Sequence, residues 1–479
     1  MNKYIFEYNT KSANYVPEIE AKPDLFLDKK FLRKGKLNLP QISEVDLARH
    51  FTNLTKDVYG VDNGIYPLGS CTMKYNPKIN EEIATLESFN NAHPYADENM
   101  LQGCYKIFYE LEKMLCEISG MESVSLEPCA GAHGELTGLL IIDKYHKSRG
   151  DFKRNKVIVP DAAHGTNPAT CSILGMEVIE IKTDCYGNIY IQELNKYLNE
   201  ETAALMLTNP NTLGFFEENI EQIADLAHSK GALLYYDGAN LNPLLGIIRP
   251  GDMGFDVMHF NLHKTFSTPH GGGGAGSGPV GVKAFLKDFL PYPRIIFQHD
   301  KYKIFIDKDK SIGRVRSFFG NFLVLIKAYV YILNLGREGL KEAGEISILN
   351  ANYLLAKLKK IFHYPFGEKI CMHEFVVSGK NFAEKGIKTL DIAKRMIDYG
   401  VHPPTIYFPL IVPEAMMFEP TETESKESID KLVNVLEKIK KEIENDPDLL
   451  KKAPNCGKIK RLNETQAARD QNVIWQNIE

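Results

Sequence analysis

The stretch VMHFNLHKTFSTPHGGGGAGSG, residues 257–278, joins a short apolar run to a lysine and four consecutive glycines. Residues 257–260 have the length and composition of a buried strand, which would place Lys264 just beyond the strand's end. Burial lowers the pKa of a lysine, and its neutral amine is the form that makes a Schiff base with a carbonyl. The glycines at 271–274 let the backbone approach a ligand closely. A surface lysine before a flexible loop fits the same residues, so Lys264 alone is only a candidate.

Further apolar runs precede this strand and alternate with segments of helical periodicity. The runs are residues 156–160, 177–181, 203–208 and 232–236, and IEQIADLAHSK at 220–230 has the pattern of a helix. Strands that are apolar throughout and alternate with helices indicate an α/β domain with a mostly parallel sheet. Ligands bind such sheets beyond the carboxyl ends of the strands, which is where Lys264 is expected.

The chain is too long for a single hydrophobic core, and its composition divides it into three predicted regions. The first region is polar and proline-containing, which suggests an extended arm that wraps around another subunit. The second carries the strands of the α/β domain. The third has a candidate strand at 374–378 and amphipathic helices at 390–399 and 426–444. The predicted divisions are an N-terminal arm over 1–65, a large α/β domain over 66–335, and a small C-terminal α+β domain with a tail over 336–479.

Bulk composition excludes several classes of function. The formal net charge is −5 and the pI is about 6.3, so a large basic surface for nucleic acid or anionic lipid is not expected. The most apolar long stretch, 318–335, contains asparagine and lysine and suits a buried helix better than a membrane span. The eight cysteines form no C-x-x-C pair, and the N-terminus has no apolar secretory segment. We therefore expect a cytoplasmic protein without a metal site, a nucleic-acid partner or a membrane partner.

An aspartate at a second strand end strengthens the case for Lys264. Asp237 follows the run 232–236, where a carboxylate can be a turn residue, a metal ligand or a counter-ion. Pyridoxal phosphate requires a carboxylate beside its ring nitrogen, because the protonated ring withdraws electrons from the substrate. Together, Asp237 and Lys264 indicate this cofactor more strongly than either residue alone.

Three other clusters follow candidate strands or precede candidate helices. PCAGAHGEL, 128–136, leads into a predicted helix over 136–146, and small residues there would expose N–H groups to a phosphate, although a plain helix start is the alternative. His164 in DAAHGTNPA, 161–169, fits a core histidine, a metal ligand or a stacking partner for an aromatic cofactor, but no second ligand has metal spacing. Thr208 begins TNPNT and offers a hydroxyl at the end of the next strand.

The segment YPLGSCTMK, 66–74, places Cys71 between two hydroxyl side chains. Cys71 could be a nucleophile, but no histidine neighbours it in the sequence and no base can be assigned. A loop on the substrate side or on the partner side is the preferred interpretation.

In this order, these segments resemble the pyridoxal-phosphate-dependent glycine decarboxylases, the P-proteins of the glycine cleavage system, and specifically the half-length type called subunit 2. The resemblance covers nearly the whole chain. It rests on YPLGSCTMKYNP (66–77), AHPYADENMLQG (92–103), PCAGAHGEL, DAAHGTNPA, TNPNTLGFFE (208–217), YYDGANLNPLLG (235–246), NLHKTFSTPHGGGG (261–274) and GRVRSFFGN (313–321). Ala275 departs from the family, which usually has proline after the four glycines, but it follows the loop.

The resemblance implies pyridoxal-phosphate fold type I, which is aspartate-aminotransferase-like, with a mostly parallel sheet in a large domain and a smaller C-terminal α+β domain. It assigns the Schiff base to Lys264 and the ring nitrogen to Asp237. The other cofactor contacts that it implies are His164 on the ring face, His263, Ala132 and His133 in the phosphate region, and Thr208 near the ring hydroxyl.

The resemblance also implies a reaction and partners. Glycine would bind through pyridoxal phosphate, lose carbon dioxide and pass its aminomethyl group to the lipoyl group of the H-protein. The assembly would be an α2β2 heterotetramer with subunit 1, which the N-terminal arm suits. A cysteine desulfurase or a class V aminotransferase is the rival enzyme, but the late cysteines, Cys371 and Cys456, lie in no glycine-rich loop. A silent scaffold subunit should have lost Lys264 or Asp237, and both are present.

Overall fold

A computed structural model describes residues 4–8, 28–31, 33–35, 39–271 and 276–474. The chain forms two compact units, residues 1–63 with residues 454–479, and residues 64–453. Part of the predicted arm, residues 1–3, 9–27, 32 and 36–38, lies outside the described residues, as do the glycines at 272–274 and Ala275. None of the described helices has the length and apolarity needed to span a membrane.

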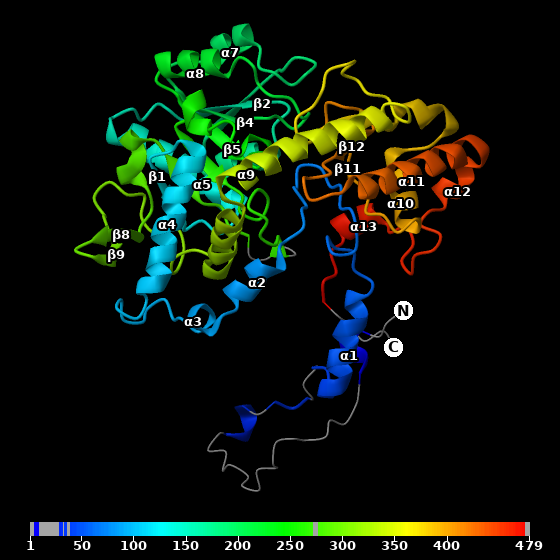
Figure 1. Cartoon of the computed structure of the whole chain (residues 1–479), viewed down its shortest axis with the longest axis horizontal. Coiled ribbons are helices and arrows are strands. Elements are labelled where there is room, and N and C mark those ends of the chain that lie inside the picture. The colour runs from blue at the N-terminus through cyan, green and yellow to red at the C-terminus, as the bar shows by residue number, and fades with distance from the viewer. Residues whose placement is uncertain (1–3, 9–27, 32, 36–38, 272–275, 475–479) are drawn as a thin grey trace. The chain divides into compact units, whose positions relative to one another are not determined.

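The larger unit is built on a seven-stranded sheet of order β1-β7-β6-β5-β4-β2-β3. Figure 1 labels β2, β4 and β5 of this sheet, which are neighbours in it. Its strands are β1 (Ser123–Ser125), β2 (Lys156–Pro160), β3 (Glu177–Ile181), β4 (Thr202–Thr208), β5 (Leu233–Gly238), β6 (Val257–Phe260) and β7 (Val280–Val282). Strands β3, β2, β4, β5 and β6 pair in parallel, and β7 is antiparallel to both β6 and β1. Every residue of β4, β5 and β6 is buried, which explains why they are continuous apolar runs in the sequence.

Helices cover both faces of this sheet. Successive side chains of a strand point to opposite faces, and the apolar side chains on each face pack against a layer of helices. Leu234 and Tyr236 of β5 pack in a core with α4 (Gln102–Ser119), α8 (Ile220–Ser229) and the first part of α9 (Phe322–Leu358). Leu233 and Tyr235 pack in the opposite core. That core also contains residues of α5 (Gly131–Ser148) and α6 (Thr166–Ile173).

The chain after the sheet forms a second, smaller layer in the same unit. Helix α9 is interrupted at Gly336, which has a φ of 61°. This break coincides with the predicted boundary between large and small domains, although that division stays a prediction. The remaining elements there are the antiparallel sheet β10-β12-β11 (Phe375–Ser378, Ala415–Phe418, Thr405–Ile406), and helices α10 (Thr389–Asp398), α11 (Lys426–Asn445) and α12 (Pro447–Lys451).

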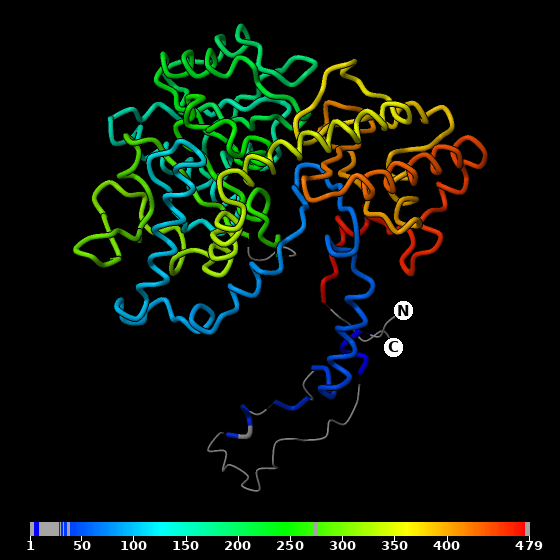
Figure 2. Tube along the Cα trace, viewed as in Figure 1, coloured from blue at the N-terminus to red at the C-terminus, as the bar shows by residue number. Residues whose placement is uncertain are grey.

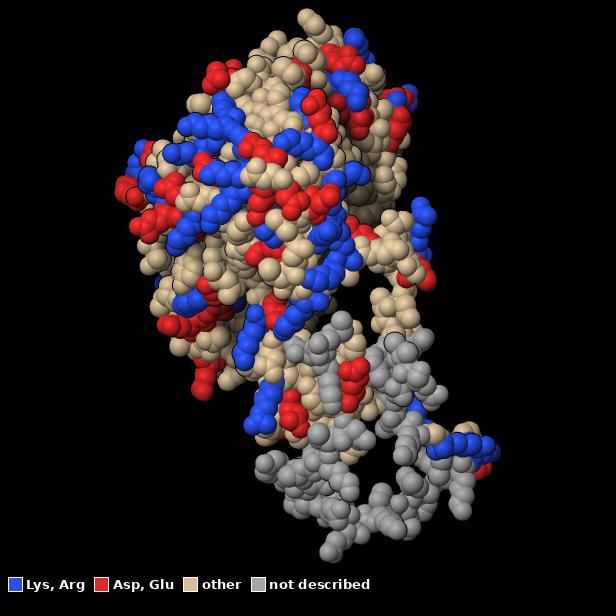
Figure 3. Space-filling model, turned by 90° about the vertical axis from the view of Figure 1, so that its right-hand side faces the viewer, with Lys and Arg blue, Asp and Glu red and all other residues tan. Residues whose placement is uncertain are grey.

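Other elements are short. The larger unit also contains α2 (Lys78–Ala84), α3 (Glu87–Asn90), α7 (Ile191–Tyr197), the hairpin of β8 (Arg294–Gln298) and β9 (Lys301–Phe305), and 3-10 helices at Asn242–Leu244, Pro250–Met253, Ala284–Phe289 and Gly379–Lys385. The smaller unit contains α1 (Glu44–Thr55), α13 (Glu464–Arg469), and 3-10 helices at Ile5–Glu7 and Lys29–Phe31. Lysine and arginine side chains are interspersed with acidic ones on the face shown in Figure 3, in keeping with the small net charge.

Most predicted elements agree with the structure to within two residues, and two helices begin elsewhere. The helix predicted from residue 136 begins at Gly131, so Ala132 and His133 lie in its first turn. The helix predicted from residue 318 begins at Phe322, because Phe318 and Gly320 have positive φ values that a right-handed helix does not permit. Strand β5 runs through Asp237 rather than ending before it.

Residues 64–77 pack against the small sheet of the larger unit. Leu68 forms a β-bridge with Phe418, and the Gly69 N–H donates to the carbonyl of Met417 over 3.3 Å. The trace of this segment therefore runs beside the small sheet (Figure 2). A Cβ on Gly69 would lie 2.2 Å from Cγ of Met417, so only glycine fits there. This packing fixes the position of the segment that contains Cys71.

Candidate active site

Lys264 lies in the turn that follows β6, at the carboxyl end of the parallel strands. Its N–H donates to the carbonyl of Asn261 over 3.0 Å, and the N–H of Ser267 donates to its carbonyl over 3.2 Å. The residue is half-buried. These bonds hold the lysine close to the end of the strand, as the sequence predicts.

Asp237 is buried at the end of β5, in register with Thr208 on β4 and His259 on β6. Its Oδ2 accepts from Nδ2 of Asn167 over 3.0 Å, and its Oδ1 accepts from the N–H of Ala239 over 3.0 Å. Burial by itself would raise the pKa of Asp237, but His259, the Asn167 amide, the Ala239 N–H and Lys264 hold it below its ordinary value. Asp237 is therefore an ionised carboxylate in an apolar sheet, which suits a buried cationic partner.

The imidazole of His259 supports Asp237 from the neighbouring strand. Nε2 of His259 lies 3.3 Å from Oδ1 of Asp237, and Nδ1 lies 2.9 Å from the hydroxyl of Tyr235. Because an ionised carboxylate only accepts hydrogen bonds, the tautomer with its proton on Nε2 fits this arrangement, and Nδ1 then accepts from Tyr235. Burial lowers the pKa of His259 more than Asp237 raises it, so the ring is neutral.

His164 lies two residues before the start of α6. The residue as a whole is exposed, but its ring packs edge-to-face against Phe408, with the ring centroids 5.7 Å apart. Nδ1 lies 3.2 Å from the backbone nitrogen of Thr166 and 2.9 Å from its hydroxyl oxygen, so Thr166 fixes the orientation of the ring. The surrounding protein desolvates the ring and lowers its pKa, and the charge of Lys264 lowers it further, whereas Asp237 raises it. His164 is thus a neutral ring within electrostatic range of both Lys264 and Asp237, a position that suits a stacking partner.

The start of α5 packs against the chain that follows Lys264. A Cβ on Gly131 would lie 2.3 Å from Oδ1 of Asn261, so the helix approaches this segment through bare backbone. Ala130 provides no side-chain cap, which leaves the first N–H groups of α5 for another acceptor. His133, in the first turn beside Ala132, accepts from the N–H of Cys129 through Nδ1 over 3.2 Å. The predicted phosphate region and the predicted Schiff-base lysine are therefore adjacent.

His263 lies beside Lys264 and faces the same backbone. Its Nδ1 accepts from the N–H of Ser277 over 3.3 Å, and a Cβ on Gly276 would lie 2.7 Å from that nitrogen. Burial, and then the charges of His270 and Lys264, lower the pKa of His263 to about 3. His263 is therefore a neutral imidazole at the edge of the candidate phosphate region.

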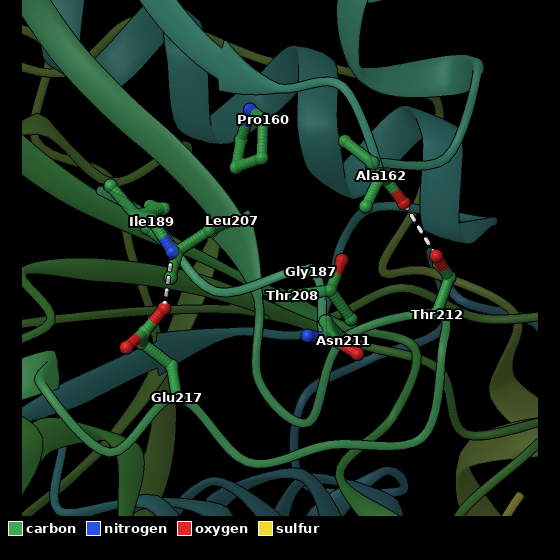
Figure 4. A pocket seen from close by; sticks show the side chains of 10 residues that line it. Pro160, Ala162, Gly187, Ile189, Leu207, Thr208, Asn211, Thr212 and Glu217 are labelled. Carbon is green, nitrogen blue, oxygen red and sulfur yellow. Dashed lines mark hydrogen bonds between the residues drawn. The ribbon is translucent and has the colours of Figure 1, made fainter. Parts of the chain in front are cut away.

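Thr208 borders a cavity at the carboxyl ends of β2 and β4 (Figure 4). The cavity opens to solvent and has an empty volume of about 340 Å³, open solvent included. It is lined by Pro160, Ala162, Ala163, Gly187, Ile189, Leu207, Thr208, Asn211, Thr212 and Glu217. Two hydrogen bonds shape its wall, from Oγ1 of Thr212 to the carbonyl of Ala162 and from the N–H of Ile189 to Glu217. Lys264 and Asp237 do not line it, so it adjoins the candidate site without containing it.

The residues at the strand ends fit pyridoxal phosphate. Several buried polar atoms in these segments lack a hydrogen-bond partner among the described residues: Oγ1 of Thr208, Nδ2 of Asn261, Oγ1 of Thr265, Oγ1 of Thr268 and Oγ of Ser277. Such atoms cost free energy unless a ligand or water satisfies them. An amine, a buried carboxylate, a neutral ring and an uncapped helix start are the four features that the cofactor needs.

A second group of buried side chains, absent from the sequence predictions, reaches Lys264 from the small sheet. Glu374 accepts from the N–H of Ser70 over 2.7 Å, and Glu419 accepts from the N–H of Thr72 over 2.8 Å. Ser70 and Thr72 both have positive φ values, so these carboxylates hold a backbone that non-glycine residues rarely adopt. Burial raises the pKa of the Cys71 thiol between them to about 11, and the charge of Lys264 opposes this shift. Nε2 of His270 also lies 2.9 Å from the carbonyl oxygen of Cys71, so the segment 66–74 packs against the chain that follows Lys264.

The sequence contained some signal for the residues that were missed. Asn167 and Glu135 stand inside the clusters DAAHGTNPA and PCAGAHGEL, and His259 stands inside the strand before Lys264. Glu374 and Glu419 follow no recognisable pattern, because they are more than a hundred residues from Lys264 in the chain and only the fold brings them near it.

Comparisons with known proteins agree with this geometry. Residues 343–455 match the family model of the glycine dehydrogenase C-terminal domain, and residues 140–275 match that of class V aminotransferases. The chain is 57% identical over 474 residues to the probable glycine dehydrogenase (decarboxylating) subunit 2 of Thermotoga maritima, which covers 98% of this chain and 99% of that protein. It is 58% identical over 479 residues to the protein of the same name from Caldanaerobacter subterraneus, with 99% of each covered.

Solved structures show the same fold at low sequence identity. A glycine decarboxylase (P-protein) of the glycine cleavage system, in inhibitor-bound form, superposes with a TM-score of 0.73 at 20% identity and covers 86% of this chain and 93% of its own. A NifS-like protein superposes with a TM-score of 0.61 at 16% identity and covers 78% and 99%, respectively. These similarities and the seven-stranded sheet confirm the predicted fold class, pyridoxal-phosphate fold type I.

Proposed function

The chain belongs to the family of glycine dehydrogenase (decarboxylating) subunit 2, and we infer from this membership and from its site that it decarboxylates glycine with pyridoxal phosphate as cofactor. The inference rests on one observation. Lys264, in the turn after β6, acts electrostatically on Asp237, a buried and ionised carboxylate at the carboxyl end of β5. Burying a charged carboxylate beside a lysine costs free energy, and neither a scaffold subunit nor a binding module needs such an arrangement. Within the fold, relatives at 53–58% identity favour glycine as the substrate over the cysteine desulfurase alternative.

Each residue has a proposed role toward the cofactor. When bound, pyridoxal phosphate supplies a ring that accepts the electron pair left on the substrate as carbon dioxide departs. Lys264 holds the cofactor through Nζ, and Asp237 keeps a proton on the ring nitrogen. Five further residues would hold the rest of the group: His164 on the ring face, His263 and the first turn of α5 with Ala132 and His133 at the phosphate, and Thr208 near the ring hydroxyl.

The partners are part of the same proposal. The relatives are named subunit 2, which implies a subunit 1, and we propose an α2β2 heterotetramer. The acceptor is the lipoyl disulfide of the H-protein. A carbon–sulfur bond forms at the aminomethyl carbon as the sulfur–sulfur bond breaks, and the released sulfur takes a proton, so the carbon is oxidised and the disulfide is reduced.

Exchange of labelled bicarbonate into the carboxyl group of glycine tests this function. With subunit 1 and lipoylated H-protein supplied, the wild-type chain should incorporate label and the K264A variant should not. A wild-type chain that binds pyridoxal phosphate but exchanges no label would refute the glycine assignment.

Borohydride reduction followed by peptide mapping tests the site separately. The cofactor should be found on the peptide that contains Lys264. A label on any other lysine would refute the assignment of the Schiff base.

A further inference from the structure

A second buried carboxylate lies directly beside Asp237. Glu135, on α5, is 3% exposed and accepts from Oγ1 of Thr166 over 2.8 Å and from Oγ1 of Thr170 over 3.1 Å. An oxygen of Glu135, an oxygen of Asp237 and a ring nitrogen of His259 all lie within 4.8 Å of one another. The same helix, α6, therefore supplies hydrogen-bond donors to both acids, Thr166 and Thr170 to Glu135 and Asn167 to Asp237.

Two buried carboxylates at this distance do not both ionise freely, because each charge disfavours the other. Burial, and then the charge of Asp237, raise the pKa of Glu135 to about 7, whereas Asp237 is held below its ordinary value. The pair therefore holds one negative charge, on Asp237, and a proton on Glu135 that leaves near neutral pH.

The other groups around the pair are neutral and cannot replace this proton. Burial raises the pKa of Tyr235 far above neutrality and that of Cys171 to about 12, and it lowers the pKa of His259. Among the described residues, the cation that acts on the pair is Lys264, and it acts on Asp237. A new positive charge at the ring nitrogen would thus change the protonation of Glu135 before that of any other neighbour.

We propose that Glu135 and Asp237 act together as a two-carboxylate, one-proton partner of the cofactor's ring nitrogen, with Glu135 losing its proton when the cationic ring binds. This inference rests on the proposed function, since it requires the cofactor to bind with its ring nitrogen at Asp237. Glu135 is a positioning residue: its charge acts on the ring through Asp237.

Glutamine at position 135 imitates the protonated acid and cannot ionise, which makes E135Q the decisive variant. The ratio of wild-type to E135Q affinity for pyridoxal phosphate should rise about tenfold between pH 6 and pH 8, because only the wild type gains the second charge. Calorimetry of cofactor binding to the full chain at pH 6, in buffers of different ionisation enthalpy, should show the wild type releasing close to one more proton than E135Q. At pH 8 the two proteins should release the same number.

The control is E424Q, since Glu424 is a half-buried acid whose pKa burial raises and which accepts from a serine hydroxyl away from the site. E424Q should match the wild type in proton release at both pH values. Equal proton release by E135Q and wild type at pH 6 would overturn the inference, because a glutamate that only ties α5 to α6 would give that result.

Two outcomes keep the test decisive. If E135Q does not fold, T170V removes one donor to Glu135 and should move the transition in cofactor affinity to higher pH, and an unmoved transition would overturn the inference. A wild-type chain that binds no pyridoxal phosphate at all would instead overturn the proposed function.

Discussion

The ion pair between Lys74 and Glu422 offers the sharpest test of how the larger unit is held together. Nζ of Lys74 donates to Glu422 over 2.6 Å, to Oδ1 of Asn242 over 2.8 Å and to the hydroxyl of Tyr331 over 3.1 Å. The two charged side chains are 1% and 9% exposed. Four separate segments therefore meet at one ammonium group: the stretch 64–77, the loop after β5, helix α9 and the chain after β12.

The K74M variant removes the charge but keeps much of the side-chain volume. It leaves Glu422 buried without its cation and removes the donor from Asn242 and Tyr331. Breaking a buried pair in this way costs about 3–5 kcal/mol of the free energy of unfolding. Burial opposes the charge on Lys74, but Glu422 and Tyr331 raise its pKa above the ordinary value, so the stabilisation should persist up to alkaline pH and disappear as the pH rises through the folded value.

Urea unfolding of K74M and wild type, compared at equal m-values, measures this loss. The control is K147M, which breaks an exposed pair between Lys147 and Asp143 on α5 and should cost about 0.5 kcal/mol or less. The double variant K74M/E422L should be more stable than K74M, because no buried charge is left alone. If K74M costs no more than K147M, the reasoning about this pair is wrong.

Other predictions concern the site and the pH dependence of stability. D237N should lower the affinity for pyridoxal phosphate about 10- to 100-fold in equilibrium dialysis, because the amide carries no charge for the ring nitrogen; unchanged affinity would contradict the role of Asp237. G131A should weaken cofactor binding by about tenfold or more, since the added Cβ would meet Asn261 at 2.3 Å, whereas G150A on the surface should not. The hydrogen bond to Asp256 raises the pKa of His228, so this pair stabilises the fold below pH 6.5 and loses its effect as the pH rises through the folded value. H228Q should therefore cost up to about 1 kcal/mol in urea unfolding at pH 6 and less at pH 9.

The strands of the large sheet were predictable from local sequence, because burial on both faces makes each one a continuous apolar run. The boundaries of β2, β3 and β6 agree with the predicted ranges. Helix starts were less predictable where they depend on backbone conformation: Gly131 begins α5 without a capping side chain, and positive φ values at Phe318 and Gly320 delay the start of α9. Neither feature has a strong compositional signature.

The functional segments were recognisable because each combines an apolar strand with an unusual polar residue at its end. Lys264, Asp237 and Thr208 are far apart in the chain, but parallel strands bring their carboxyl ends to one edge of the sheet. The sequence alone therefore predicted which residues gather at this edge of the sheet and which chemistry they suit; their contacts with the cofactor stay a prediction.

Only the tertiary structure revealed the charges around those residues. The approach of Glu135 to Asp237, and of Glu374 and Glu419 to Lys264, depends on how α5, α6 and the small sheet pack against the strand ends. Electrostatic effects depend on distance and burial, which a linear pattern does not record. The sequence predicted a pyridoxal-phosphate site, whereas the protonation state of each candidate residue depends on how the elements pack around it.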